Sequence, residues 1–444
     1  MNNIDSHQKS SNFIIEKLKK YLSMNNKTLL HFFVIVGTSQ TIYSVVALRE
    51  VLYEPFRSVL GTSNAAFGTL FGLVGIVQIF GYLAFGWLQD KVNIRSLLTI
   101  DLLGYGICAL IMSSIPNLPY SVLVIIFCLF GFFGDAIYWP TVQKSIKGVS
   151  HPDKQATVFG FMEAWRGVSG IILNSLGIII YAVLGNVLFG MRVAMSFNSL
   201  LMILFAFVVW KYIPNNFLKD TIQNSKKKIT LKQDKENILL SLKNPVVWLT
   251  GISASCIYAV FTGVTTYFVP FLQNTYALPV AMVGIFGVIN GQVTRMITSA
   301  LSGVISDGKF KNSASWMAIC YGLIACVFVA ILIIPRKSAF LFVMVPLMLL
   351  VSIFCYFIRG IYYAPIGEAK IPNEYSATAM SIASFIGYSP NFWSFTLFGY
   401  LLDKYPKSLS YKYIFIILLV LSFLGIITNI INSHLISREI QKKG

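Results

Sequence analysis

Seven charged side chains lie inside long apolar stretches of this 444-residue sequence. They are Arg49, Glu50, Asp135, Glu163, Arg166, Arg295 and Arg359. A charge inside an apolar helix is energetically costly, so each one indicates a binding, proton-carrying or charge-balancing position. The set holds four arginines and three carboxylates. A guanidinium group binds carboxylate, phosphate and sulfonate groups well, so this surplus of positive charge favours recognition of an anion.

The stretches that hold these residues are those of a membrane protein. The chain is 56% hydrophobic and 12% charged, whereas soluble proteins average about 25% charged residues. Apolar runs of about 20 residues, the length that crosses a bilayer, recur along the whole chain. The net charge of +18 does not indicate nucleic-acid binding, because the lysines cluster in short segments between these runs.

Twelve runs are long enough to be spanning helices, which predicts an all-α membrane protein. The first six cover 29–55, 64–88, 95–114, 119–144, 156–184 and 191–212. The others cover 245–272, 278–306, 313–334, 338–366, 376–402 and 411–435. The predicted organisation is a tail at 1–28, a six-helix bundle at 29–212, a polar loop at 213–243, a second six-helix bundle at 244–435 and a tail at 436–444.

The distribution of lysine and arginine predicts the orientation. With the N-terminus in the cytoplasm, about 24 of these cations fall in cytoplasmic segments and about 7 on the other side. Cytoplasmic loops of membrane proteins carry such an excess. We therefore expect a multi-pass protein of the cell's inner (plasma) membrane, with the N- and C-termini in the cytoplasm.

A short motif occurs twice, roughly half the chain apart, which is typical of a duplicated domain. The first copy holds Gly86, Asp90 and Lys91, and the second holds Gly303 and Asp307. Other matches between the halves are Ile42-Tyr43 with Ile257-Tyr258, Pro55-Phe56 with Pro270-Phe271, Asp135 with Arg359, and Gln78 with Arg295. The twelve helices are therefore predicted to form two pseudo-symmetric bundles.

These features resemble the major facilitator superfamily. The resemblance rests on the motif residues Gly86, Asp90, Lys91, Arg95, Gly303 and Asp307, on the six-plus-six helix pattern and on the basic central loop. It covers nearly the whole chain. The first copy departs from the family pattern at Asn93 and Ile94, and the second at Gly308. The resemblance implies that these motif residues gate the cytoplasmic side.

A narrower resemblance involves the stretch from Arg359 to Pro365, followed by Glu368, by Ile371-Pro372 and by Ile386 to Pro390. It is similar to a bacterial group labelled nitrate/nitrite-porter-like, which includes carriers linked to sulfosugar use. True nitrate porters have an arginine in helix 2, whereas this helix has Gln78. That difference makes nitrate less plausible than a larger organic anion.

In the resembled family, helices 1, 4, 7 and 10 line a central cavity. Two-fold symmetry then sets Asp135 opposite Arg359. The two residues are predicted to form a gated pair or to hold opposite ends of a substrate, with a static structural pair as the alternative. Arg49 is expected to turn away from this cavity or to extend outward. The predicted substrate-binding residues are Tyr43, Asp135, Trp139, Arg166, Tyr258, Arg295, Arg359 and Tyr362.

Three carboxylates are candidates for proton coupling, because a carboxylate inside an apolar helix can bind and release a proton during transport. They are Glu50, Asp135 and Glu163, and Asp135 is the leading one. Glu163 and Arg166 lie three residues apart and can pair along their helix. That pair either only neutralises charge or lets Arg166 contact substrate while Glu163 exchanges a proton.

The sequence thus predicts a secondary active transporter of a small organic anion, working by alternating access and coupled to protons. An exporter of a drug or siderophore shares the same fold. A non-transporting membrane sensor or scaffold would need an appended soluble module. No nucleophile–base constellation indicates an enzyme, and no metal or other cofactor is expected. The expected partners are a small-molecule substrate, the lipid bilayer and protons, and the protein is expected to be monomeric.

Overall fold

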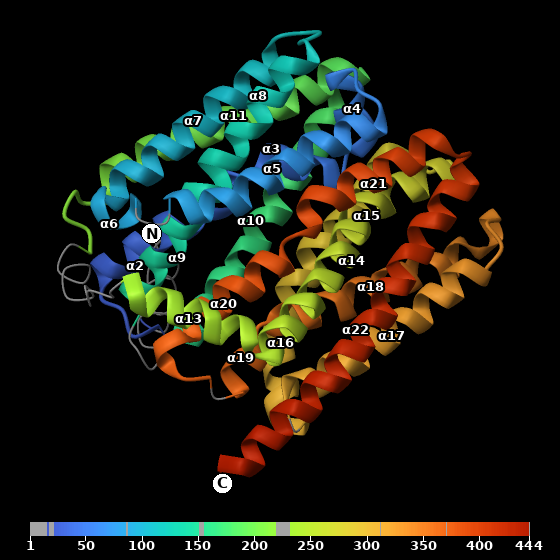
Figure 1. The fold of residues 1–444 in the computed structure, drawn as a ribbon. Helices are drawn as coiled ribbons and strands as arrows, with labels where there is room; N and C mark the ends of the chain where they lie inside the picture. Colours follow the sequence, from blue (N-terminus) through green and yellow to red (C-terminus); the bar gives the residue numbers. More distant parts are fainter. Residues whose placement is uncertain are drawn as a thin grey trace, which may run out of the picture.

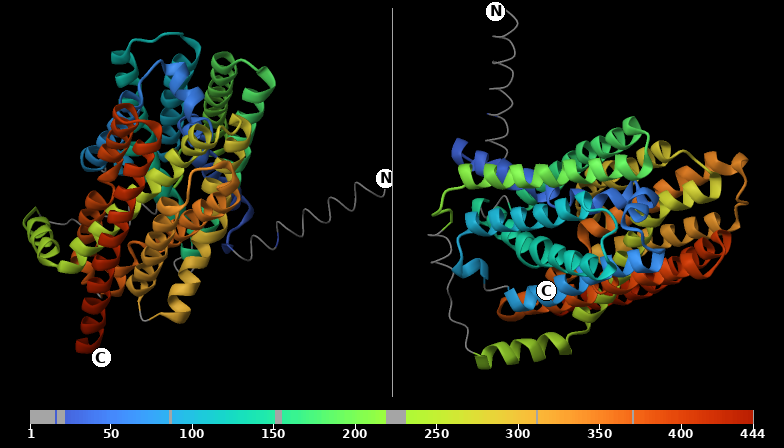
Figure 2. Two further views of the ribbon diagram at one scale, coloured as in Figure 1. Left: turned by 90° about the vertical axis from the view of Figure 1, so that its right-hand side faces the viewer. Right: turned by 90° about the horizontal axis from the view of Figure 1, so that it is seen from above.

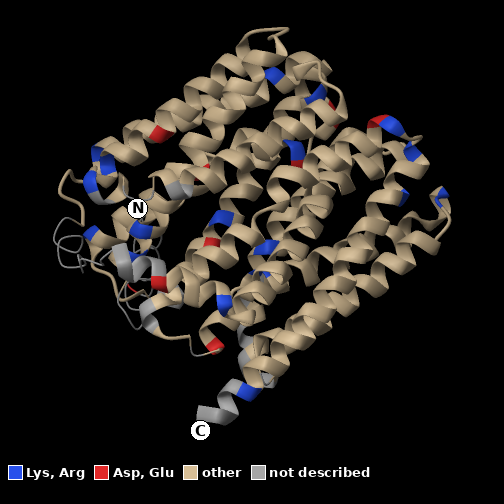
Figure 3. Ribbon diagram, in the orientation of Figure 1, with Lys and Arg blue, Asp and Glu red and all other residues tan. Residues whose placement is uncertain are grey.

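The computed structural model describes Glu16 and residues 22–85, 88–150, 155–218, 231–310, 312–369 and 371–443. Within these ranges every regular element is a helix. Most of the helices run side by side, and the N-terminal and C-terminal parts of the chain occupy opposite sides of the molecule (Figure 1). Charged residues gather at the helix ends, while a smaller group lies about halfway along, between the two sides (Figure 3).

The elements from α2 to α11 pack on one another and are called here the N-terminal bundle. They are α2 (Asn26–Thr41), α3 (Ser44–Ala47), η1 (Leu48–Glu50), α4 (Tyr53–Leu60), α5 (Asn64–Phe85), α6 (Leu88–Lys91), α7 (Ile94–Ser114), α8 (Tyr120–Phe130), η2 (Gly131–Tyr138), α9 (Trp139–Val149), α10 (Gln155–Leu184) and α11 (Val187–Tyr212).

The elements from α14 to α22 form the C-terminal bundle. They are α14 (Pro245–Tyr276), α15 (Val280–Val288), η4 (Ile289–Val293), α16 (Thr294–Lys309), α17 (Ser313–Ile333), η5 (Ser338–Phe340), α18 (Leu341–Ile361), α19 (Ala364–Glu368), α20 (Asn373–Gly387), α21 (Pro390–Lys404) and α22 (Lys407–Lys443). A separate helix, α13 (Leu231–Lys243), precedes this bundle in the chain.

These elements make twelve spans in two six-helix bundles. Ten helical stretches in the described ranges, some of them made of several consecutive elements, are long and apolar enough to cross a membrane. The bent pair of Asn26–Thr41 and Ser44–Glu50 supplies an eleventh span. The consecutive helices α20 and α21 supply the twelfth.

Several spans predicted to be continuous are broken, and three of the breaks lie just before a proline. Pro55, Pro365 and Pro390 lie in the first turns of α4, α19 and α21. A proline has no amide hydrogen and its ring clashes with the preceding turn, so the first turn of a helix is the position that tolerates it best. Pro270 and Pro346, by contrast, lie inside the continuous helices α14 and α18. The spans at 29–55, 338–366 and 376–402 are chains of shorter helices.

Two other boundaries differ from the sequence prediction. The segment 213–243, predicted to be a loop, contains helix α13. Helix α22 continues to Lys443, beyond the predicted end at 435. A periodic apolar pattern predicts only the part of a helix that faces a bilayer, so polar helical extensions are missed.

The two bundles are in close contact at one end, called here the closed end. There the start of α5 lies against the end of α21. Gly68 and Gly72 lie against the backbone at Phe395 and Phe392, and Gly399 against the backbone of Asn64. Side chains at these glycines would push the helices apart, so the small residues explain the close approach. The other end, where α13 and α19 lie with Lys443, is called the termini end (Figures 1 and 2).

Candidate functional site

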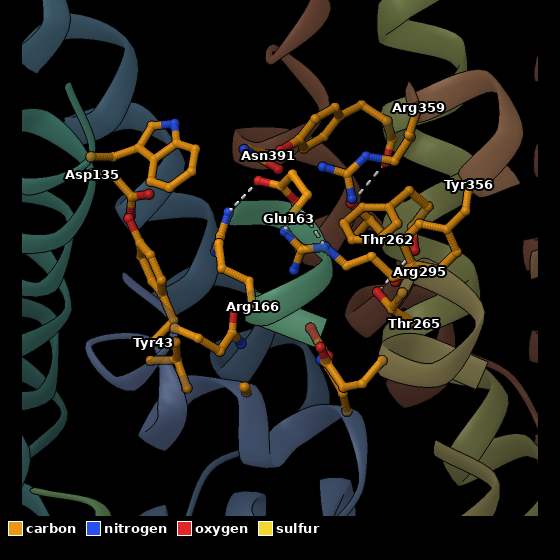
Figure 4. A pocket seen from close by; sticks show the side chains of 18 of the residues that line it. Tyr43, Asp135, Glu163, Arg166, Thr262, Thr265, Arg295, Tyr356, Arg359 and Asn391 are labelled. Atoms are coloured by element: carbon orange, nitrogen blue, oxygen red, sulfur yellow. Dashed lines mark hydrogen bonds and ion pairs between the residues drawn. The ribbon is translucent and has the colours of Figure 1, made fainter. Parts of the chain in front are cut away.

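A cavity of about 1080 Å³ lies between the two bundles. Its lining combines aromatic rings with charged and amide side chains from both bundles. All ten residues predicted from sequence to bind substrate or protons line it: Tyr43, Glu50, Asp135, Trp139, Glu163, Arg166, Tyr258, Arg295, Arg359 and Tyr362. Elements η1, η2, α9, α10, α14, α16 and α18 thus deliver polar groups to one space (Figure 4).

Glu163 joins the two bundles through two arginines. Its Oε1 accepts a hydrogen bond from Arg166 of the same helix at 3.0 Å. Its Oε2 accepts from Nε of Arg295 on α16 at 3.1 Å, and also from Nη2 of Arg295. One carboxylate therefore balances two guanidinium groups (Figure 4). The sequence predicted the local pair with Arg166, but it did not predict the pair with Arg295.

Asp135 and Trp139 occupy the other side of the cavity, on the N-terminal bundle. The Asp135 carboxylate lies beside the Tyr43 side chain (Figure 4). The Tyr43 hydroxyl donates to the carbonyl of Gly134 at 2.8 Å, which holds the tyrosine against this helix. The Arg166 guanidinium lies 4.4 Å from the ring centroid of Trp139, within range of a cation–π contact.

Arg359 projects from α18 on the opposite side of the cavity. Its guanidinium carbon lies 3.7 Å from the ring centroid of Phe261 and 5.0 Å from that of Tyr258. Its Nε is buried without a hydrogen-bond partner. Among the described residues, no carboxylate oxygen lies within 4.0 Å of it. Asp135 and Arg359 line the same cavity but form no ion pair in this conformation.

The expectation that Arg49 turns away from the cavity is wrong. Its side chain lines the cavity and its guanidinium carbon lies 4.2 Å from the ring centroid of Phe71. Its Nη2 is 3.9 Å from Oε1 of Glu50. The expectation assumed one straight helix. The chain instead bends between Thr41 and Ser44, and this bend changes the direction in which the following side chains, including that of Arg49, point.

Glu50 also faces the C-terminal bundle. The amide of Gln292 donates to its Oε2 at 3.5 Å, a long hydrogen bond that crosses between the bundles. A second crossing contact joins Asn391, on α21, to Gln78 of α5 at 3.1 Å. Asn391 and Gln292 were not predicted as site residues, although amide side chains inside apolar helices are an indication of such positions.

Two π-helical segments set the direction of cavity residues. Asp135 lies within η2, and Gln292 lies within η4, directly before the helix that carries Arg295. A π-helix has a wider turn than an α-helix, so it rotates the residues that follow it, and such segments are frequent at functional sites. Apolar periodicity does not reveal them.

Two of the six predicted gating residues, Lys91 and Arg95, have side chains that the structure describes. Gly86 lies outside the described residues, and the side chains of Asp90, Gly303 and Asp307 are not described, although their helices are. Lys91 is exposed at the end of α6. The Arg95 guanidinium lies 4.1 Å from the ring centroid of Trp210, which ties the start of α7 to α11.

In the described ranges, no group of three or more His, Cys, Asp or Glu side chains is close enough to share a metal ion. The cavity instead offers guanidinium groups, carboxylates, amides, hydroxyls and aromatic faces. These groups can recognise a small polar molecule and can carry charge.

The sequence profile described as Major Facilitator Superfamily matches residues 28–395. The chain belongs to the major facilitator superfamily. Like other members of this superfamily, it is a multi-pass membrane transporter and not an enzyme.

Two Escherichia coli K12 proteins are similar to this major facilitator chain. Inner membrane protein YihN is 27% identical over 403 residues, covering 91% of this chain and 94% of YihN. Inner membrane protein YqcE is 24% identical over 375 residues, covering 83% and 86%.

Solved structures share the fold at low identity. A bacterial homolog of the human lysosomal transporter Spinster, in an inward-facing and unoccupied conformation, aligns with a TM-score of 0.70 at 13% identity, covering 94% of this chain and 98% of the homolog. A mutant of the nucleoside transporter NupG aligns with a TM-score of 0.69 at 13% identity, covering 92% and 100%.

Proposed function

We propose that this transporter moves a small organic anion across the inner membrane by alternating access, coupled to protons. In this proposal the termini are cytoplasmic and the anion binds in the cavity between the bundles. The cavity holds four arginines, Arg49, Arg166, Arg295 and Arg359, and three carboxylates, Glu50, Asp135 and Glu163. The charge balance of the lining supports an anionic ligand.

The observation that carries this proposal is the environment of Arg359. The other cavity arginines each lie within 4.0 Å of a carboxylate oxygen. Arg359 has aromatic rings on its sides, a buried Nε without a partner, and no carboxylate at ion-pair distance in the described parts of the chain. A buried guanidinium of this kind gains from an anionic partner, because its own charge is otherwise only partly solvated. We assign that partner to the substrate.

The remaining polar groups fit the other parts of such a substrate. The hydroxyls of Tyr362 and Tyr388 are 3.0 Å apart and lie on the cavity wall near Arg359. Asp135, on the opposite wall, lies without a cation within 4.0 Å in the described structure. A substrate with an acidic group at one end and hydroxyl groups along its length would contact Arg359, these tyrosines and Asp135 together.

The contacts between the bundles support alternating access. At the closed end the bundles touch, and the cavity reaches Gln143 and Phe159 on the helices that lead to the termini end. We infer that the cavity opens toward the termini, which is the cytoplasmic side in this proposal. The Glu163–Arg295 ion pair joins the two bundles within the cavity. An anion that binds Arg295 in place of Glu163 would therefore weaken this contact between the bundles.

A ligand screen followed by uptake tests this function. Purified protein is scanned for thermal stabilisation by organic acids, sugar phosphates and sulfonates, and hits are then assayed for uptake into proteoliposomes. We expect an anion to stabilise wild type, and Arg359→Gln to lose that stabilisation and the uptake. Arg438→Gln is the matched control, because Arg438 is exposed near the end of α22, away from the cavity.

Two outcomes would contradict the proposal. One is stabilisation of wild type and Arg359→Gln by the same anions to the same extent. The other is stabilisation only by bulky apolar compounds, which would favour the exporter of a drug or siderophore instead.

A further inference from the structure

Helix α13 lies outside the twelve spans, beside the termini end of the C-terminal bundle. It runs across the general direction of the spanning helices and packs on α20 (Figures 1 and 2). A single residue, Asn244, separates its last residue, Lys243, from the start of α14 at Pro245. The helix is therefore held at the level where a spanning helix leaves the bilayer.

Between Glu236 and Lys243, both of which are exposed, α13 buries two uncharged polar side chains and exposes four apolar ones. Its polar residues Asn237 and Ser241 are buried, with Ser241 fully so. The Ser241 hydroxyl donates to the carbonyl of Asn237 at 2.8 Å. Its apolar residues point outward instead: Ile238, Leu239, Leu240 and Leu242 are 40–54% exposed. A helix facing water usually buries its apolar side chains and exposes its polar ones. Exposure of these four apolar side chains to water would therefore be energetically unfavourable.

The neighbouring surface has the same apolar character. Met380 and Phe385 are exposed on α20, the helix on which α13 packs. Trp248 is 43% exposed at the start of α14, and its indole N–H donates to the carbonyl of Leu242 at 2.7 Å. A tryptophan with one polar contact and an exposed ring is typical of the boundary between lipid headgroups and acyl chains.

We propose that α13 is an interfacial helix, embedded in the leaflet on the termini side with its apolar face toward the acyl chains. Lys243, exposed at the end of the helix, supplies a cation for the headgroups. Cations beside an apolar helical face bind anionic phospholipid surfaces. The occupant of the face is therefore phospholipid, and the helix anchors the connection between the two bundles to the membrane.

Spin labels measure this placement directly. Leu239→Cys and Leu242→Cys are made separately in a background whose six cysteines are replaced, labelled, and reconstituted into vesicles of phosphatidylethanolamine and phosphatidylglycerol. Both positions are exposed, so the substitutions leave the packing on α20 intact. Relaxation by oxygen, which concentrates among acyl chains, is compared with relaxation by a water-soluble nickel complex.

Two reference positions calibrate the result. Phe385→Cys reports the exposed surface of α20, and Asn216→Cys reports an exposed turn on the same side of the molecule. We expect the oxygen-to-nickel ratio at positions 239 and 242 to match that at 385 and to exceed that at 216. A ratio equal to that at 216 in these protein-free lipid vesicles would overturn the proposal, since the face would then be open to water or reserved for a protein partner.

Discussion

Glu163 is the carboxylate that balances arginines from both bundles, so its charge can be tested in isolation. Glu163→Gln keeps the size of the side chain but leaves Arg166 and Arg295 without a counter-charge. We expect this change to destabilise the protein by about 2 kcal/mol, because an unpaired buried charge is costly. Thermal unfolding of the purified protein in anion-poor buffer measures the loss as a lower Tm.

Glu163→Asp is the matched control, because it keeps the charge and shortens the side chain by one methylene. Its Tm should lie between those of wild type and Glu163→Gln. Added sulfate should raise the Tm of Glu163→Gln more than that of wild type, since the anion then takes the place of the missing carboxylate. Equal Tm values for all three proteins would show that Glu163 does not balance the arginines.

Asp135 is the carboxylate that we expect to carry the coupled proton. If it does so, the initial rate of anion uptake by wild type varies between about pH 5.5 and 8, and the rate for Asp135→Asn does not vary, because an amide does not titrate in this range. Uptake into proteoliposomes at a series of pH values measures this. Glu236→Gln, at an exposed carboxylate on α13, should keep the wild-type profile.

Residue-level prediction from the sequence succeeds where the interaction is local. The pair of Glu163 with Arg166 follows from a spacing of three residues on one helix. The pair of Glu163 with Arg295 joins helices from different bundles, and no periodicity in the sequence encodes it. Arg49 shows the other limit, because its direction depends on a bend in the chain that a straight-helix argument leaves out.

At the scale of whole helices, Asp403 fastens the two bundles at the closed end. From the end of α21, its Oδ1 accepts from the backbone N–H of Asn64 at 3.1 Å, and its Oδ2 accepts from that of Ala65 at 2.6 Å. These are the first amides of α5, so a residue of the C-terminal bundle caps a helix of the N-terminal bundle. The carboxylate also complements the positive end of that helix.

Removal of this cap should favour opening of the closed end. We expect Asp403→Ala to cost the present conformation about 1 kcal/mol, which shifts an equilibrium about five-fold. Spin labels at Ser58→Cys and Ser408→Cys, exposed residues on opposite bundles, report the change as a longer distance. Asp403→Asn should have a smaller effect, because Asn is also a good helix cap. An unchanged distance in Asp403→Ala would mean that the cap does not hold this end closed.

The elements themselves were largely predictable, and their interruptions were not. Runs of about 20 apolar residues identify spans because a bilayer requires that length. The breaks before Pro55 and Pro390 depend on whether neighbouring helices satisfy the freed backbone groups, which a single run does not reveal. Helix α13 was missed because its charged sequence, seen without its surroundings, indicates a polar loop.

For the molecule as a whole, the internal repeat was the informative signal. The matched positions of Asp135 and Arg359 in the two halves of the sequence predicted a shared central space, and both residues line one cavity. Symmetry of the sequence does not specify which end of that cavity is closed. Which end is closed depends on contacts between the bundles, such as those of Gly68 and Gly399, whose neighbours lie on the other bundle.

Alternating access requires the closed end to open during each cycle, so a covalent link across it should stop transport without blocking binding. Asn64 and Asp403 are hydrogen-bonded side chains on opposite bundles. Asn64→Cys and Asp403→Cys, combined in a cysteine-free background, can be joined by a short reducible linker. We expect uptake to fall to background after linking and to return on reduction, while the anion still raises the Tm of the linked protein, because the cavity stays accessible from the termini end.

Each single-cysteine variant treated with the linker is the control, since it carries the reagent without a bridge. Uptake by the bridged protein at the unlinked rate would contradict alternating access, because the solute would then cross without separation of the two bundles at the closed end.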